Sequence, residues 1–92
     1  MGLEYLMQPW RQLGLEAWKA GNDLEAIKCF WRSAEEHKQN SLEWAISYRL
    51  YGLALIQVQR EVEGTFALEK ADVVLDLFGI AAFDQSNIPT HS

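Results

Sequence analysis

Two stretches of this chain carry the same spaced set of small and apolar residues, and this repetition restricts the fold more than any other feature. The first set is followed by the second after a shift of 38 residues, and the two sets are Leu13, Gly14, Ala17, Ala26, Phe30 and Tyr51, Gly52, Leu55, Gly64, Leu68. Small residues on two packed helices let their backbones approach, and larger residues flank the crossing. The sequence therefore predicts two antiparallel helix hairpins. Gly14 should face Ala26 in the first hairpin, and Gly52 should face Gly64 in the second.

Residues that begin and end helices divide the first hairpin. Pro9 suits the first turn of a helix, and Gly21 suits the left-handed position that ends one, which predicts a first helix over 9–20. Asn22 is then expected to cap a second helix over 23–38 through its side chain.

The second hairpin has similar boundaries. Ser41 is expected to cap a third helix over 42–59, which is apolar on most sides. A turn follows near 60–63, and a fourth helix runs from about 63 to 78 and stops at Gly79. No segment shows the strict alternation of a β-strand. We expect an all-α fold, a four-helix array of two antiparallel hairpins.

The length allows one small domain, over residues 1–79, followed by a C-terminal tail over 80–92. Apolar residues make up 49% and charged residues 23%, which is typical of a globular chain, and no apolar run is long enough to cross a membrane. The net charge of −5 disfavours nucleic acid as a partner. The first residues lack a signal-peptide pattern, and Cys29 is the only cysteine, so we expect a cytoplasmic location and a buried, unreactive thiol.

The first stretch resembles the tetratricopeptide repeat family, whose motif runs Trp-x-x-Leu-Gly-x-x-Tyr, then Ala-x-x-x-Phe, then Pro. The residues that match are Trp10, Leu13, Gly14, Ala26 and Phe30. Ala17 stands where Tyr is usual, and the closing Pro is absent. The second stretch departs further, with Tyr51 for Leu and Gly64 for Ala, and its shift of 38 residues exceeds the family period of about 34. The resemblance implies an α-solenoid-type array; the alternative is an unrelated four-helix bundle.

In this family the first helix of each hairpin lines a groove that binds an extended peptide or a helix. Carried onto this chain, the resemblance implies a groove lined by Arg11, Leu15, Trp18, Lys19, Arg49, Leu53, Ile56 and Gln57. Leucines occupy the places where polar residues would grip a terminal carboxylate. The groove should therefore bind an amphipathic helix, or a peptide with acidic flanks, from a partner protein. The alternative is that the tail over 80–92 covers Trp18.

A second apolar surface is predicted on the last helix. Phe66, Val73 and Leu77 recur at i, i+7 and i+11, on a different side from the residues that can face the third helix. The terminal helix of a repeat array normally has a polar outer face. We therefore expect these residues to contact a partner chain or a second copy, which would make a homodimer.

The pattern of chemically active residues does not favour an enzyme. Glu35, Glu36 and His37 are consecutive on a helix and point in different directions, and Asp72 and Asp76 are expected to be solvated. No phosphate-binding loop or nucleophile–base pair occurs, and we expect no cofactor or metal. The sequence predicts a protein-interaction module, either an adaptor or a small chaperone. The alternative is a structural subunit that only associates with itself.

Overall fold

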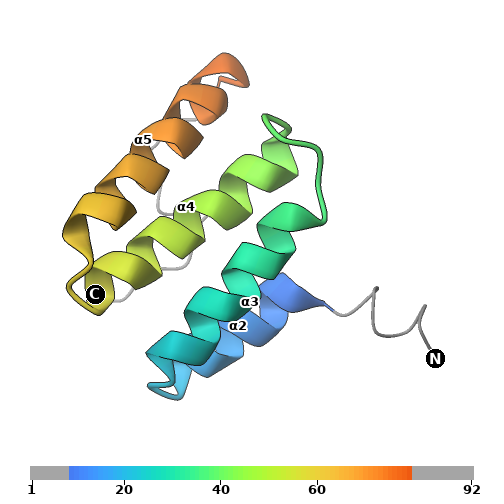
Figure 1. The fold of residues 1–92 in the computed structure, drawn as a ribbon. Helices are drawn as coiled ribbons and strands as arrows, with labels where there is room; N and C mark the ends of the chain where they lie inside the picture. Colours follow the sequence, from blue (N-terminus) through green and yellow to red (C-terminus); the bar gives the residue numbers. More distant parts are fainter. Residues whose placement is uncertain (1–8, 80–92) are drawn as a thin grey trace.

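A computed structural model describes residues 9–79 and contains four α-helices, whose bounds are α2 Trp10–Lys19, α3 Asp23–Glu35, α4 Leu42–Gln57 and α5 Glu61–Leu77 (Figure 1). No strand occurs in this part of the chain. The helices pack in chain order, α2 on α3, α3 on α4 and α4 on α5, so α2 and α5 lie at opposite ends of the array. The predicted all-α fold of four helices is confirmed. The predicted tail over 80–92 lies outside the described residues.

Helices α2 and α4 end in the same way. The chain turns left-handed at Gly21 (φ 85°) after α2 and at Gln59 (φ 67°) after α4. In each case the next N–H donates back to a carbonyl five residues earlier, from Asn22 to Ala17 (2.8 Å) and from Arg60 to Leu55 (2.9 Å). Both helices therefore end in a Schellman motif.

Several predicted helix boundaries are wrong. Helix α4 ends at Gln57 rather than 59, because Gln59 takes the left-handed position that usually belongs to Gly or Asn. The turn therefore lies at 58–60 and α5 begins at Glu61, before the predicted start at 63. Helix α3 ends at Glu35, so the expected residues 36–38 lie outside it.

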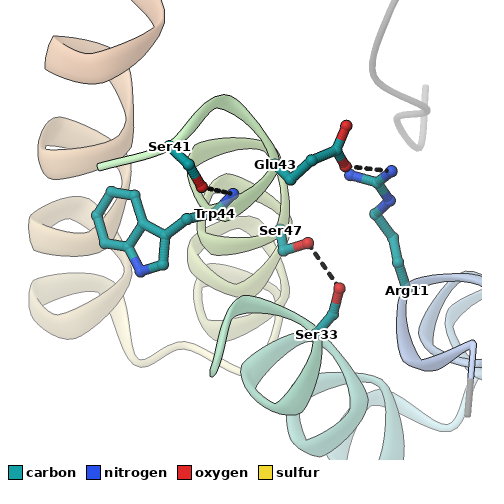
Figure 2. A network of polar contacts seen from close by, with 6 residues as sticks. All are labelled: Arg11, Ser33, Ser41, Glu43, Trp44 and Ser47. Carbon is teal, nitrogen blue, oxygen red and sulfur yellow. Dashed lines mark hydrogen bonds and ion pairs between the residues drawn. The ribbon is translucent and has the colours of Figure 1, made fainter. Parts of the chain in front are cut away.

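One of the two predicted helix caps is confirmed and the other is wrong. The Ser41 hydroxyl accepts a hydrogen bond from the backbone N–H of Trp44 (3.2 Å), which confirms Ser41 as the cap of α4 (Figure 2). Asn22 does precede α3, but its side chain makes no capping hydrogen bond, so that prediction is wrong. The acidic first turn of α3, with Asp23 and Glu25, lies at the positive end of the helix dipole.

Two apolar clusters hold the array together, and α4 contributes to both. The first cluster joins α2, α3 and α4 through Trp18, Ala26, Phe30, Leu50 and Ala54. The second joins α3, α4 and α5 through Ala34, Trp44, Ala45, Ala71, Val74 and Leu75. The indole of Trp18 meets the ring of Phe30 edge-on, with centroids 5.7 Å apart. Buried Cys29 also belongs to the core, as predicted.

The predicted close crossing of the second hairpin is confirmed. A Cβ atom built on Gly52 would lie 2.8 Å from the carbonyl oxygen of Gly64, and one built on Gly64 would lie 2.7 Å from that of Gly52. The first hairpin differs from the prediction. The atoms nearest a Cβ on Gly14 belong to the Phe30 ring (2.6 Å) and to Cys29 rather than to Ala26, because the large ring fills the space at this crossing.

Candidate protein-interaction surface

Both arginines of the predicted groove are engaged within the array. Arg11 of α2 forms an ion pair with Glu43 of α4, with 2.9 Å between Nη2 and Oε1 (Figure 2). Arg49 is buried, and its Nε donates to Oδ1 of Asp72 on α5 at 3.2 Å. The first pair links α2 to α4, which are not consecutive helices. The second pair links α4 to α5. Their contribution to binding a partner stays a prediction.

The other residues of the predicted groove lie at different depths. Trp18 is only 6% exposed and shares an apolar cluster with Leu50 and Ala54 of α4, so it is not an exposed residue of this face. The alternative expectation, that the tail over 80–92 covers Trp18, lies outside the described residues. Leu15 and Leu53 are half-buried against this cluster. The half-buried side chain of Ile56 lies beside Gly64, and only Lys19 and Gln57 are exposed.

Four large apolar side chains lie exposed in a line along α5, and we call them the α5 outer stripe. They are Val62, Phe66, Val73 and Leu77, which are 86%, 59%, 62% and 80% exposed. A helix turns about 100° per residue, so positions i, i+4, i+11 and i+15 fall on one face. The expected exposure of Phe66, Val73 and Leu77 is confirmed, and their contact with a partner stays a prediction.

The opposite face of α5 packs on α4 and carries Gly64, Ala67, Ala71, Val74 and Leu75, all buried. Helix α5 is therefore apolar on two opposite faces. Its outer face lies at the end of the array, where no other described helix covers it (Figure 1).

Sequence reasoning missed Val62 because it placed residue 62 in a turn. Since α5 begins at Glu61, Val62 lies one turn before Phe66 and extends the stripe by four residues. The signal was present in the spacing, because Val62 also stands eleven residues before Val73. Only the early end of α4 at Gln57 makes room for this extra turn.

Acidic residues lie beside the stripe. Glu61 and Glu69 line a shallow depression of about 430 Å³ together with Val62, Thr65 and Phe66. On the other edge, the ammonium of Lys70 lies 5.5 Å from the centre of the Phe66 ring, in a cation–π contact.

Arg60 and Glu63 are paired at the start of α5. Arg60 donates from Nε and Nη2 to the two carboxylate oxygens of Glu63, at 2.7 and 2.8 Å. This hydrogen bonding lowers the pKa of the Glu63 carboxyl and raises the pKa of Arg60. Both residues of this pair are exposed. Glu63 is therefore ion-paired with Arg60, whereas Glu69 forms no ion pair with any described residue.

An aromatic group that the sequence analysis did not single out packs α3 on α4. Trp44 stacks on Tyr48 (4.7 Å between centroids), Tyr48 stacks on Tyr51 (5.6 Å), and Trp31 of α3 meets Tyr51 at 5.2 Å. Burial, followed by the neighbouring Tyr48, raises the pKa of the Tyr51 phenol. The spacing i, i+4 and i+7 of the three α4 residues was the available signal. Their mutual contacts indicate a packing role.

Cys29 is the only cysteine within residues 9–79, and its thiol is buried. Burial and then the nearby Glu25 carboxylate raise the pKa of the Cys29 thiol, which makes it less nucleophilic. No group of three His, Cys, Asp or Glu side chains in this range is placed to hold a metal ion. None of the four described helices combines the length and apolar character that a membrane-spanning segment needs.

Comparison with known proteins adds no family. No protein-family model matches the chain, and no curated protein or solved structure matches it at a significant level.

Proposed function

We propose that this chain is a protein-interaction module, a two-hairpin array of the tetratricopeptide repeat type, that binds a partner through the α5 outer stripe. The observation that carries the proposal is the exposure of Val62, Phe66, Val73 and Leu77, each at least 59% exposed, in one line on the last helix. Contiguous exposed apolar surface on a small protein marks an interaction site. An adaptor or a small chaperone would use such a surface.

The size of the stripe sets the kind of binding. Fully burying one large apolar side chain contributes roughly 1.5–3 kcal/mol, so these four, already partly buried, contribute roughly 4–8 kcal/mol. Association costs roughly 4–15 kcal/mol of lost freedom. The stripe alone therefore supports only weak binding, and the charged residues along its edges must contribute to affinity and specificity.

A second candidate function is a structural subunit that associates with itself through the same stripe. The spacing favours it, because the intervals between stripe residues are four, seven and four and read the same in both directions. Two antiparallel copies would set Val62 opposite Leu77 and Phe66 opposite Val73. Such a contact is isologous, the commonest arrangement of a homodimer.

A photo-crosslinking amino acid in place of Val73 tests the proposed function in the native cell. The matched control carries the same amino acid in place of Leu24, which is also an exposed apolar residue but lies on α3, away from the stripe. We expect a specific adduct from position 73 and none from position 24. The adduct should disappear when Leu77→Gln is added. Identical adducts from both positions, or none from a folded protein, would refute the proposal, and the adduct mass distinguishes a different protein from a second copy.

A further inference from the structure

The charges beside the α5 outer stripe are distributed unevenly between its two edges. Glu69 and Asp76, two turns apart, are exposed on one edge, and Glu61 joins Glu69 along the depression over Val62. No described residue forms an ion pair with any of these three carboxylates. The stripe therefore has an edge of free negative charge along most of its length.

The opposite edge is nearly neutral. Glu63 is held by Arg60 through two hydrogen bonds, and Lys70 lies over the Phe66 ring. Asp72 lies on the same side of the helix as Glu69 and Asp76, farther from the stripe, and is paired with Arg49. A partner on the stripe thus meets apolar side chains in the middle and unpaired carboxylates on one side.

From this arrangement, and building on the proposed function, we infer that the stripe binds a basic amphipathic helix of a different protein. Apolar side chains of that helix would cover the stripe, and its Lys or Arg side chains would face Glu61, Glu69 and Asp76. Val62 and Leu77 are fifteen residues apart, about 22 Å along the helix, which corresponds to about four turns of a partner helix. Helix recognition by anchors at such spacing is a common binding mode.

The charges along the edges of the stripe disfavour a second copy of this chain as the binding partner. In an antiparallel pair related by a two-fold axis, each edge of the stripe lies beside the same edge of its mate. Glu69 would then face Glu69 of the second copy, and Lys70 would face Lys70. Like charges across a contact are destabilising, and each chain carries a net charge of −5. The spacing of the apolar residues permits this dimer, but the like charges along the edges of the stripe disfavour it. A basic amphipathic helix would cover the apolar residues and also pair with the carboxylates.

Two fluorescein-labelled helical peptides of about 18 residues test the inference. Both carry Leu at the stripe spacing; one has Lys along its flanks, and the other has Glu at the same positions. Fluorescence anisotropy would measure their binding to the full-length chain at low and high salt. We expect the Lys peptide to bind and the Glu peptide not to bind, and the affinity of the Lys peptide to fall as salt screens the carboxylates.

A charge-reversed variant gives the decisive comparison. Combining Glu69→Lys with Asp76→Lys should weaken the Lys peptide roughly tenfold and allow the Glu peptide to bind. The matched control combines Glu16→Lys with Glu36→Lys, which makes two such changes at exposed carboxylates away from the stripe and should leave both affinities unchanged. Circular dichroism of every variant establishes that the fold is retained, so a lost affinity reports on binding.

Three results would overturn the inference, and they bear differently on the proposed function. Equal binding of both peptides would show that the carboxylates do not select the partner, while the interaction surface remains. A dimer by light scattering at micromolar concentration, lost in Val73→Gln, would make a second copy the occupant and leave an interaction function through the stripe. Absence of peptide binding, dimer and crosslinked adduct would overturn the inference and the proposed function together.

Discussion

Replacing Gly52 with alanine tests the close crossing of α4 and α5. A methyl group at this position would lie 2.8 Å from the carbonyl oxygen of Gly64 and 3.1 Å from the Cβ of Ala67. The carbonyl belongs to the backbone of a helix and cannot move alone. The two helices must therefore separate to admit the methyl group.

The sign of the stability change distinguishes this crossing from an ordinary helical glycine. At an uncrowded position within a helix, Gly→Ala stabilises a protein by about 1 kcal/mol. Overpacking a tight contact costs roughly 1–3 kcal/mol, and at Gly52 the added methyl meets both backbone and Cβ atoms. We expect the upper part of that range here, which leaves a net loss of about 2 kcal/mol for Gly52→Ala. For a domain of this size the melting temperature should fall by roughly 8–16 °C.

Urea unfolding followed by circular dichroism would measure the change, with Thr65→Ala as the control. Thr65 is exposed on α5 next to Gly64, so its replacement changes helix propensity without crowding and should raise stability slightly. The double variant Gly52→Ala with Gly64→Ala should lose less than the sum of the single losses, because the first methyl has already separated the helices. Stabilisation by Gly52→Ala of about 1 kcal/mol would refute the close crossing.

Three further substitutions test local features of the fold. Gln59→Gly should stabilise the protein by about 0.5–1 kcal/mol, because exposed Gln59 holds a left-handed φ of 67°. Gly21→Ala at the matching turn (φ 85°) should destabilise it by a similar amount. Thermal melts would show opposite shifts in melting temperature, and shifts of the same sign would contradict the left-handed assignment. Ser33 and Ser47 share a buried hydrogen bond of 2.7 Å between α3 and α4, so Ser47→Ala alone should cost about 1–3 kcal/mol in a urea titration, while adding Ser33→Ala should restore part of that loss; strictly additive losses would argue against the bond. The raised pKa of Cys29 means that the folded state favours the neutral thiol, so its stabilising effect is complete below about pH 8.5 and is lost as pH rises through the folded-state pKa; Cys29→Ala should remove this decline, and an unchanged pH profile of unfolding would contradict it.

The helices could be predicted because their cores and most of their ends are set by local chemistry. Gly21 and Gly79 both turn left-handed after a helix, and Ser41 caps α4 through its hydroxyl, as residue type alone suggested. The Gly52–Gly64 crossing followed from two small residues at matching positions of one hairpin. These features depend on few residues close in sequence.

The misplaced end of α4 shows where local chemistry is insufficient. Gln59 has no intrinsic preference for a left-handed conformation, and tertiary packing of α4 against α5 on both sides of the turn holds it there. This one position shifted the predicted start of α5 and concealed Val62, the first residue of the outer stripe. An error of two residues at a helix end thus changed the composition of a candidate site.

The burial of Trp18 was not predicted for a different reason. Helical spacing was taken to separate its face from that of Gly14, but the two residues are four apart in α2, both are buried, and both pack against the Phe30 ring. In the structure, Leu50 and Ala54 of α4 share a cluster with Trp18. Replacing Trp18 would therefore damage the core, where loss of a large aromatic side chain costs about 3–5 kcal/mol, and would not isolate binding.

Helix α5 allows stability and binding to be separated because its two faces contribute to different states of the protein. Its inner face uses Gly64, Ala67 and Ala71 to approach α4 closely, while Phe66 and Leu77 point outward. An exposed side chain stabilises the isolated chain little, so polar replacements in the outer stripe should change the free energy of unfolding by no more than about 0.5 kcal/mol each. The free energy available from burying the stripe is gained only when another helix covers it. A set of stripe variants that fold normally but lose their partner is therefore the expected signature of the proposed surface. The three carboxylates along its edge, which form no ion pair with a described residue, favour a basic partner over a second acidic copy.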